Sequence, residues 1–96
     1  MEQITILHGN TQPISFEVED MDGQPVDLTQ GQYKLMLDNR EIEFEVRGVN
    51  KNQVYFVLQG NMDLLCKTYS LTLYKNKGGL WQMRLPMKDC IKVVND

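Results

Sequence analysis

The sequence predicts an all-β domain, a sandwich or barrel of about seven or eight strands. Apolar and polar side chains alternate at every second residue in several separate segments. A strand requires this pattern because its successive side chains point to opposite faces of a sheet. Short clusters rich in Gly, Asn and Asp, which are typical of turns, separate these segments. Short strands and turns at such regular spacing are typical of sandwiches and barrels.

The clearest alternating segment runs from Glu41 to Arg47, where Ile42, Phe44 and Val46 alternate with charged residues. A helix would not bring these three apolar side chains to one side, whereas a strand does. We therefore expect one strand here, with its apolar face towards the core. The other predicted strands, in chain order, are Ile4 to Leu7, Ile14 to Val18, Tyr33 to Leu37, Val54 to Leu58, Tyr69 to Leu73, Trp81 to Leu85 and Ile91 to Val94.

The connections between these strands are of two kinds. The segment from Gly60 to Lys67 is too long for a tight hairpin, and we expect it to form a single helical turn capped by Asn61 that carries the chain from one sheet to the other. Tyr69, which follows it, occupies the place of the tyrosine corner of immunoglobulin-like sandwiches, in which the hydroxyl bonds to upstream backbone. The remaining connections are expected to be tight turns at Asp20 to Gly23, Asp38 to Arg40, Gly48 to Asn52 and Asn76 to Gly79.

Length and composition indicate one globular domain that covers residues 1–96. Hydrophobic residues make up 42% of the chain and charged residues 24%, which are ordinary proportions for a folded protein. No linker, internal repeat or low-complexity tract divides the chain. The N-terminus has no basic and apolar leader, and no apolar run approaches the ~20 residues that span a bilayer. We therefore expect cytoplasmic synthesis and no membrane partner.

The distribution of charge argues against nucleic acid as a partner. The net charge of −3 and the pI near 5.0 lack the positive field that binds phosphate backbones. Residues 1–30 carry acidic side chains and no Lys or Arg, whereas residues 67–92 carry six basic side chains against Asp89 alone. These two segments either neighbour each other inside the domain, which is the favoured interpretation, or pair head to tail between subunits and build rings or fibres.

Residues that could carry catalysis are few and dispersed. A Ser-His-acid mechanism needs a base within hydrogen-bond reach of the nucleophile. The chain offers one histidine, His8, and the serines Ser15 and Ser70 in the middle of predicted strands. The glutamates at positions 41, 43 and 45 share one strand face, so we interpret them as a solvated face rather than as glycosidase carboxylates in a cleft. The sequence thus predicts no catalytic residues and no enzyme activity.

No metal or cofactor site is expected either. Cys66, Cys90 and His8 are scattered and fall short of the four ligands of a structural zinc site. The stretch from Asp20 to Gly23 has the first residues of a calcium loop, but the twelfth position, where such a loop needs Glu, is Gly31. We interpret this stretch as a turn. In a reducing compartment both cysteines are expected to be buried thiols rather than a disulfide.

Three aromatic residues are candidates for a ligand-stacking surface. Tyr55, Tyr74 and Trp81 could serve as a platform for a carbohydrate, and the last two flank a basic turn. Core packing is the favoured interpretation of Trp81, because its position is in phase with Met83 and Leu85.

The segment Gly9-Asn10-Thr11-Gln12-Pro13-Ile14-Ser15-Phe16-Glu17-Val18, followed by Asp20 to Thr29, resembles the N-terminal immunoglobulin-like domain of phage and prophage baseplate upper proteins. In that family a Gly-polar-Thr start precedes an alternating strand and then a D-x-D-G-x-P-V-D-L-T hairpin. The late run from Tyr69 to Leu73 agrees in strand rhythm. The pattern D-x-D-G-x-P-V also occurs in bacterial cell-surface immunoglobulin-like repeats, which usually place a glycine shortly after the valine, where this chain has Leu28-Thr29.

The resemblance implies an immunoglobulin-like antiparallel β-sandwich that acts as a non-enzymatic structural module of a phage or prophage tail or baseplate. Its partners would be other virion or tail proteins, or further copies of the chain. After synthesis in the cytoplasm the protein would become part of the virion. The alternative is a carbohydrate-binding module or a cell-surface immunoglobulin-like adhesion module. The pattern of residues does not identify an interface.

Overall fold

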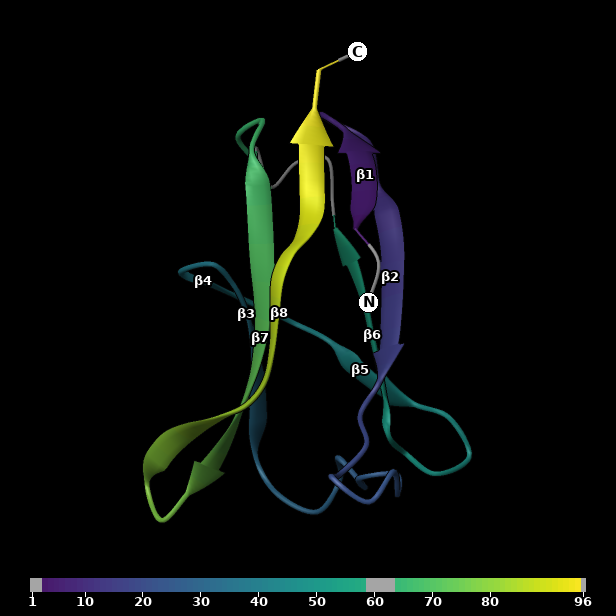
Figure 1. Cartoon of the computed structure of the whole chain (residues 1–96), viewed down its shortest axis with the longest axis vertical. Helices are drawn as coiled ribbons and strands as arrows, with labels where there is room; N and C mark the ends of the chain where they lie inside the picture. Colours follow the sequence, from purple (N-terminus) through teal and green to yellow (C-terminus); the bar gives the residue numbers. More distant parts are fainter. Residues whose placement is uncertain (1–2, 59–63, 96) are drawn as a thin grey trace.

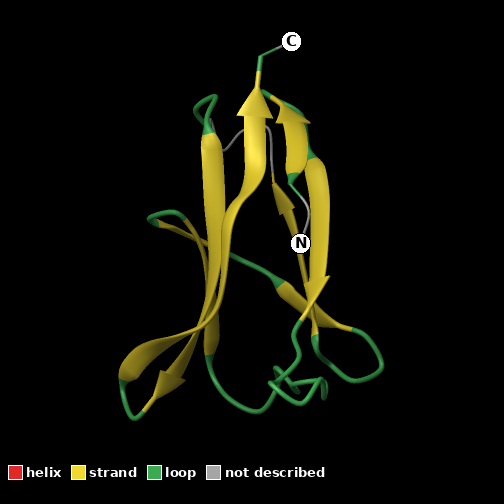
Figure 2. Ribbon diagram, in the orientation of Figure 1, coloured by secondary structure: helices red, strands yellow, loops and turns green. Residues whose placement is uncertain are grey.

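The computed structural model describes residues 3–58 and 64–95, and these ranges contain strands but no helix. The strands are β1 (Ile4–Leu7), β2 (Gln12–Glu17), β3 (Tyr33–Leu37), β4 (Arg40–Ile42), β5 (Glu45–Arg47), β6 (Gln53–Leu58), β7 (Thr68–Lys77) and β8 (Leu80–Val94). They form a five-stranded sheet in the order β1-β8-β7-β3-β4 and a three-stranded sheet in the order β2-β6-β5, which pack as a sandwich (Figure 1, Figure 2). The predicted all-β sandwich is therefore confirmed. Within the described ranges no helix is long and apolar enough to cross a membrane.

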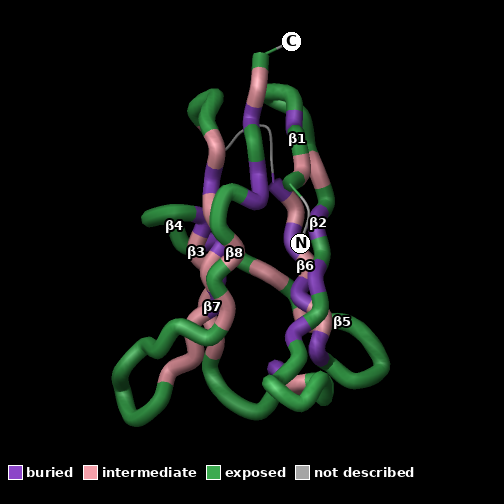
Figure 3. Tube along the Cα trace, viewed as in Figure 1, coloured by how far each residue is buried: buried purple, intermediate pink, exposed green. Residues whose placement is uncertain are grey.

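The core lies between the two sheets and consists of the inward-facing side chains of the alternating strands. Along β6 buried and half-buried residues alternate, with Val54, Phe56 and Leu58 inside, and β2 contributes Ile14 and Phe16 in the same way. Each fully buried side chain of this size stabilises the fold by roughly 1.5–3 kcal/mol relative to an exposed one. Buried segments occur in both sheets (Figure 3). The five-stranded sheet supplies most of the side chains that are almost completely enclosed: Leu35, Leu37, Leu71, Leu73 and Ile91.

Tight turns form at positions that the sequence indicates. Asp38 begins the turn between β3 and β4 with a φ of 50°, a conformation that Asp tolerates better than most residues. Gly78 and Gly79 join β7 to β8 with φ values of 64° and 88°, positive at both positions as a two-residue type I′ turn requires. Side chains support both turns, because Asp38 Oδ1 accepts a hydrogen bond from the Ser70 N–H and Asn76 Oδ1 accepts one from the Gly79 N–H.

The segment from Glu41 to Arg47 does not form the single predicted strand. Its first part belongs to β4 in the five-stranded sheet and its last part to β5 in the three-stranded sheet, while Glu43 and Phe44 cross between the sheets (Figure 1). The prediction was wrong because alternation specifies side-chain directions but not the partner of each strand. The expected inward face is retained, since Ile42 is buried in the core and Phe44 and Val46 pack half-buried against it.

The connection from β6 to β7 carries the chain from the three-stranded sheet to the five-stranded sheet, as predicted. The Tyr69 hydroxyl donates a hydrogen bond of 2.9 Å to the Leu65 carbonyl, so the expected corner contact is present. The predicted helical turn is not seen: Leu64 to Lys67 are not helical, and the expected cap Asn61 lies outside the described residues.

The last two predicted strands are parts of one long strand, β8, whose register against β7 slips twice. At the first irregularity the Asp89 N–H donates a hydrogen bond of 2.9 Å to the Ser70 hydroxyl, so a side chain takes the place of a ladder bond. The second slip falls between Leu73 and Tyr74 and adds one residue on β8. Such bulges bend a strand and change which face its side chains occupy.

Strand β1 pairs with β8 in parallel, so the sandwich is not wholly antiparallel, contrary to the prediction. The ladder begins with Ile4 opposite Ile91 and ends with Leu7 opposite Val94. The antiparallel arrangement was implied by the resemblance, and the alternation of side chains contains no information about strand direction that could have corrected it. Because β1 covers only this end, no described strand lies on the other side of β8 from Leu80 to Lys88. This part of β8 is a free sheet edge with backbone groups available for pairing.

Candidate binding surface on the β7–β8 hairpin

The end of the β7–β8 hairpin bends away from the three-stranded sheet (Figure 1, lower left), and Figure 3 shows that most of it is exposed. Leu80, Trp81 and Met83 have exposed fractions of 70%, 40% and 56%. Single exposed apolar residues are common on protein surfaces, but several of them on one hairpin end indicate a candidate binding site. We call these three residues the hairpin patch.

The prediction that Trp81 packs in the core is wrong. It assumed that Trp81 stays in phase with Met83 and Leu85, which holds only while the register is regular. The slip between Leu73 and Tyr74 adds one β8 residue, so side chains beyond it change phase relative to Leu85. Leu85 packs half-buried against the core, whereas Trp81 lies on the hairpin end, where the three-stranded sheet does not reach.

A basic side chain from β3 lies beside the Trp81 ring. Lys34 is directly opposite Tyr74 in the β3–β7 ladder, and its Nζ lies 5.6 Å from the Tyr74 ring centroid and 4.5 Å from the Trp81 ring centroid. Such cation–ring attraction contributes about 0.5–1 kcal/mol at an exposed site. Lys34 therefore links two aromatic rings that come from different strands. The third aromatic candidate, Tyr55, is not part of this group, because it lies on β6 in the other sheet.

The hairpin end is also basic. Residues 75–88 carry Lys and Arg side chains and no Asp or Glu. A hollow of about 450 Å³ is lined by Lys75 and Arg84 from the hairpin and by Glu19 and Asp20 from the loop that follows β2. The acidic first part and the basic last part of the sequence are therefore neighbours within one domain.

The aspartate-rich stretch in that loop forms the predicted turn. Asp20 Oδ1 accepts hydrogen bonds of 2.9 Å from the N–H groups of both Asp22 and Gln24. An isolated antiparallel bridge between Glu19 and Pro25 closes the turn. The Asp20 carboxylate is thus used to hold the backbone of the loop.

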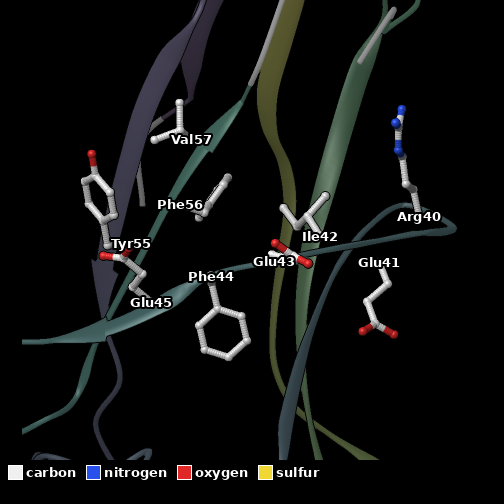
Figure 4. A pocket seen from close by; sticks show the side chains of 9 residues that line it. All are labelled: Arg40, Glu41, Ile42, Glu43, Phe44, Glu45, Tyr55, Phe56 and Val57. Carbon is white, nitrogen blue, oxygen red and sulfur yellow. The ribbon is translucent and has the colours of Figure 1, made fainter. Parts of the chain in front are cut away.

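A second surface feature lies where the chain crosses between the sheets. Side chains of β4, β5, β6 and the crossing segment enclose a groove of about 470 Å³ (Figure 4). Its apolar surface comes from residues at the margin of the core, and its charge comes mainly from Glu41, Glu43 and Glu45. They are exposed, as predicted, but they do not share one strand face, because they belong to β4, the crossing segment and β5. We call this surface feature the acidic groove, and it is lined by Arg40, Glu41, Ile42, Glu43, Phe44, Glu45, Tyr55, Phe56 and Val57.

The glutamates of the acidic groove differ in their partners. Glu45 forms an ion pair of 2.7 Å with Arg47, whose guanidinium lies 3.5 Å from the Tyr55 ring centroid. Glu41 and Glu43 have no such cation among residues 3–58 and 64–95. One end of the groove therefore keeps uncompensated negative charge.

The residues considered for catalysis lie in different parts of the sandwich. His8 follows β1, and its backbone N–H donates to the Val94 carbonyl. Ser15 lies on β2 in the other sheet, opposite Tyr55. The Ser70 hydroxyl accepts the hydrogen bond from Asp89 at the first β8 irregularity. The structure does not bring the histidine together with either serine.

The two cysteines are free and differ in exposure. Cys66 is exposed, so the expectation that both thiols are buried is wrong for it, and its Sγ lies 3.2 Å from Asn95 Oδ1. Cys66 precedes β7 in the connection between the sheets, where no strand face directs it inward. Cys90 is buried, and this burial raises the pKa of its thiol. In the described part of the chain no cluster of His, Cys, Asp or Glu has the arrangement of a metal site.

Comparison with known proteins assigns no family to this chain. No protein-family model matches it, and no curated protein matches it. A functional proposal therefore starts from the sequence and from the two surfaces described above.

Proposed function

We propose that this chain is a non-enzymatic, immunoglobulin-like module of a phage or prophage tail or baseplate that docks to other virion proteins through its β7–β8 hairpin. The observation that carries the docking role is the hairpin patch, in which Leu80, Trp81 and Met83 are exposed on an arm that bends away from the three-stranded sheet. Trp, Met and Arg are enriched at the centres of protein interfaces. The patch combines such residues with a basic surrounding.

The strand order supports the immunoglobulin-like part of the proposal. The order β2-β6-β5 corresponds to strands B, E and D of that fold, and β8-β7-β3-β4 corresponds to strands G, F, C and C′. Tyr69 lies near the start of β7, the place of the tyrosine corner in strand F, and its hydroxyl bonds to the Leu65 carbonyl. Both features follow from the same arrangement of two sheets.

The resemblance of residues 9–29 to baseplate upper proteins supports the phage assignment. The first part of this segment contains β2, and the second part forms the loop beside the hairpin. Within the loop, the hydroxyl and the N–H of Thr29 donate hydrogen bonds to the Asp27 carboxylate and thereby lower the pKa of Asp27. The motif therefore shapes the loop that lines the hollow next to the hairpin.

Co-expression with the proteins encoded by neighbouring genes, followed by size-exclusion chromatography, tests the proposal. We expect a complex with a tail or baseplate protein that a Leu80→Ser/Met83→Ser variant loses. Val49→Ser is the matched control, because Val49 is a fully exposed apolar residue in the β5–β6 turn. Neighbouring genes that encode no virion protein, or a complex that the hairpin variant leaves intact, would overturn the proposal.

A carbohydrate-binding module is the second candidate function, and the exposure of Trp81 favours it. The Lys34 ammonium group lies over the rings of both Tyr74 and Trp81. Planar aromatic rings are suitable platforms for flat ligands. Lys34 covers part of the faces of both rings, so less ring surface remains for a sugar. This favours docking to virion proteins over carbohydrate binding. A glycan array separates the two: binding by the wild-type chain that Trp81→Ala abolishes would establish the second function, and an array without signal rejects it.

A further inference from the structure

We propose that the β7–β8 hairpin of one copy of this chain docks against the acidic groove of a second copy, so that the chain assembles head to tail. The inference rests on the docking role proposed for the hairpin and names a partner for that surface. Its two halves are described above, and they match in charge, in apolar surface and in available backbone.

The charges of the two surfaces are complementary. The hairpin end carries Lys75, Lys77 and Arg84. Glu19 and Asp20 line the same hollow as Lys75 and Arg84, but none of the three cations forms an ion pair within the described residues. The groove carries Glu41 and Glu43, which have no cation partner among the described residues. Opposite charges on facing surfaces guide association and fix the orientation of a complex.

The apolar surfaces are also complementary. The groove exposes part of Phe44, and the buried Ile42 also lines it, beside the Glu43 carboxylate (Figure 4). Its volume of about 470 Å³ is in the range of small-molecule pockets, about 300–1,000 Å³, so it has room for an indole ring. Trp81 is the side chain that a second copy offers for it, and its ring loses exposed apolar area when it enters.

The backbone at both surfaces is free to pair. From Leu80 to Lys88, β8 has no described strand on its outer side, and β4 is the opposite edge of the same sheet. Pairing β8 with another β8 would place Arg84 and Lys88 near their own copies, and like charges on neighbouring strands are destabilising. Pairing β8 with β4 of a second copy brings no such row of like charges together, because β4 holds one basic and one acidic residue, Arg40 and Glu41.

The two surfaces do not meet within one molecule. No hairpin residue lines the groove, and β7 and β3 separate β8 from β4 in the sheet. Contact between them must therefore join different copies. When two copies join in this way, one hairpin and one acidic groove remain unoccupied. Further copies bind to these surfaces, so the assembly continues into a ring or a fibre.

Two variants that each lose one surface test the inference. The groove variant, Glu41→Lys/Glu43→Lys, keeps the hairpin and Trp81. The hairpin variant, Lys77→Glu/Arg84→Glu/Trp81→Phe, keeps the groove and contains no tryptophan, because the chain has only one. All five positions are exposed, so both variants are expected to fold, and circular dichroism verifies this.

Sedimentation velocity and Trp81 fluorescence are the measurements. We expect the wild-type chain to self-associate with rising concentration and to dissociate in about 1 M salt, where the screening length is about 3 Å. Each variant alone should remain a monomer, whereas the mixture should form a 1:1 dimer that does not grow. In that mixture the emission of Trp81 should shift to shorter wavelength.

Other results would overturn the inference. If the wild-type chain and the mixture of variants both stay monomeric, the two surfaces do not bind each other. If either variant alone still self-associates, the interface lies elsewhere. If the chain is monomeric yet still forms the hairpin-dependent complex with a tail protein, only the self-assembly is rejected. If that complex is also absent, the proposed docking function fails as well.

Discussion

The Tyr69 hydroxyl donates a hydrogen bond of 2.9 Å to the backbone carbonyl of Leu65, four residues earlier in the chain. The contact lies where the chain passes from the three-stranded sheet to the five-stranded sheet. The Tyr69 ring is buried, and Lys67 Nζ lies 4.7 Å from its centroid. The start of β7 is thereby fixed to the connection that precedes it.

Tyr69→Phe should lower the free energy of unfolding by about 1 kcal/mol, because it removes this hydrogen bond and retains the buried ring. Urea denaturation measures the change. Tyr55→Phe is the control, since the Tyr55 hydroxyl makes none of the hydrogen bonds in the described residues, and we expect it to change stability by less than about 0.5 kcal/mol. Equal losses in the two variants would show that the corner contact does not stabilise the fold.

Asp38 should make the protein more sensitive to acid. Burial alone would raise the pKa of Asp38, but hydrogen bonds from Lys67 Nζ and from the Ser70 N–H lower it below its ordinary value of 3.8. A carboxyl whose pKa is lower in the folded state stabilises the fold above its unfolded pKa, and this contribution disappears as the pH falls through the folded pKa. Asp38→Asn should therefore show a smaller loss of stability between about pH 7 and pH 3 than the wild type.

The Asn variant retains a side chain that tolerates the positive φ and can accept the Ser70 hydrogen bond. Asp38→Ala removes both advantages and should cost about 1–2 kcal/mol at neutral pH. Urea unfolding at a series of pH values compares the three proteins. An acid decline in Asp38→Asn as steep as that of the wild type would assign the decline to other carboxyl groups.

Trp81→Ser should lower the free energy of unfolding of the monomer by only about 1 kcal/mol, because it removes the contact with Lys34 but leaves no cavity in the core. Leu73→Ala is the contrast, because Leu73 is completely buried and its truncation should cost about 2–5 kcal/mol. Acrylamide should quench the fluorescence of Trp81 in the dilute native protein. A fluorescence spectrum that acrylamide cannot quench, or a large loss of stability in Trp81→Ser, would place the ring in the core.

The two thiols should react at very different rates. Cys66 is exposed and should be labelled by a maleimide in the native protein within the time of mixing and reading. Cys90 is buried and burial raises its pKa, so it holds little thiolate and should react only when the protein unfolds. Mass spectrometry of labelled peptides distinguishes the sites, and comparable native labelling of both would contradict the structure.

Local features of the fold could be predicted from the sequence because they depend on residues close together in the chain. Alternation located the strands, and Gly78 and Gly79 indicated a hairpin because few other residues adopt their positive φ values. The corner contact of Tyr69 could be expected because it spans only four residues. These features follow from backbone conformation and from the direction of individual side chains.

Features that depend on distant partners could not be predicted. The regular pattern around Glu43 and Phe44 is the same whether the chain stays in one sheet or crosses to the other, so the division into β4 and β5 was missed. Nothing local to Trp81 indicates the extra residue that shifts the register after Leu73. The acidic groove was missed for the same reason, and exposure of Trp81 was only the less favoured of two interpretations, because the surroundings of these residues are set by the packing of the sheets.

The pairing of Ile4 with Ile91 joins positions near the two ends of the described chain. During synthesis on the ribosome, β1 has no partner until almost the whole domain has emerged, so this ladder is completed last. Long sequence separation between contacting residues slows folding, and the parallel closure of this sheet belongs to that slow class. Until β1 pairs with β8, the outer edge of β8 is unpaired along its full length. At that stage a newly synthesised molecule is most prone to aggregate with a neighbouring molecule.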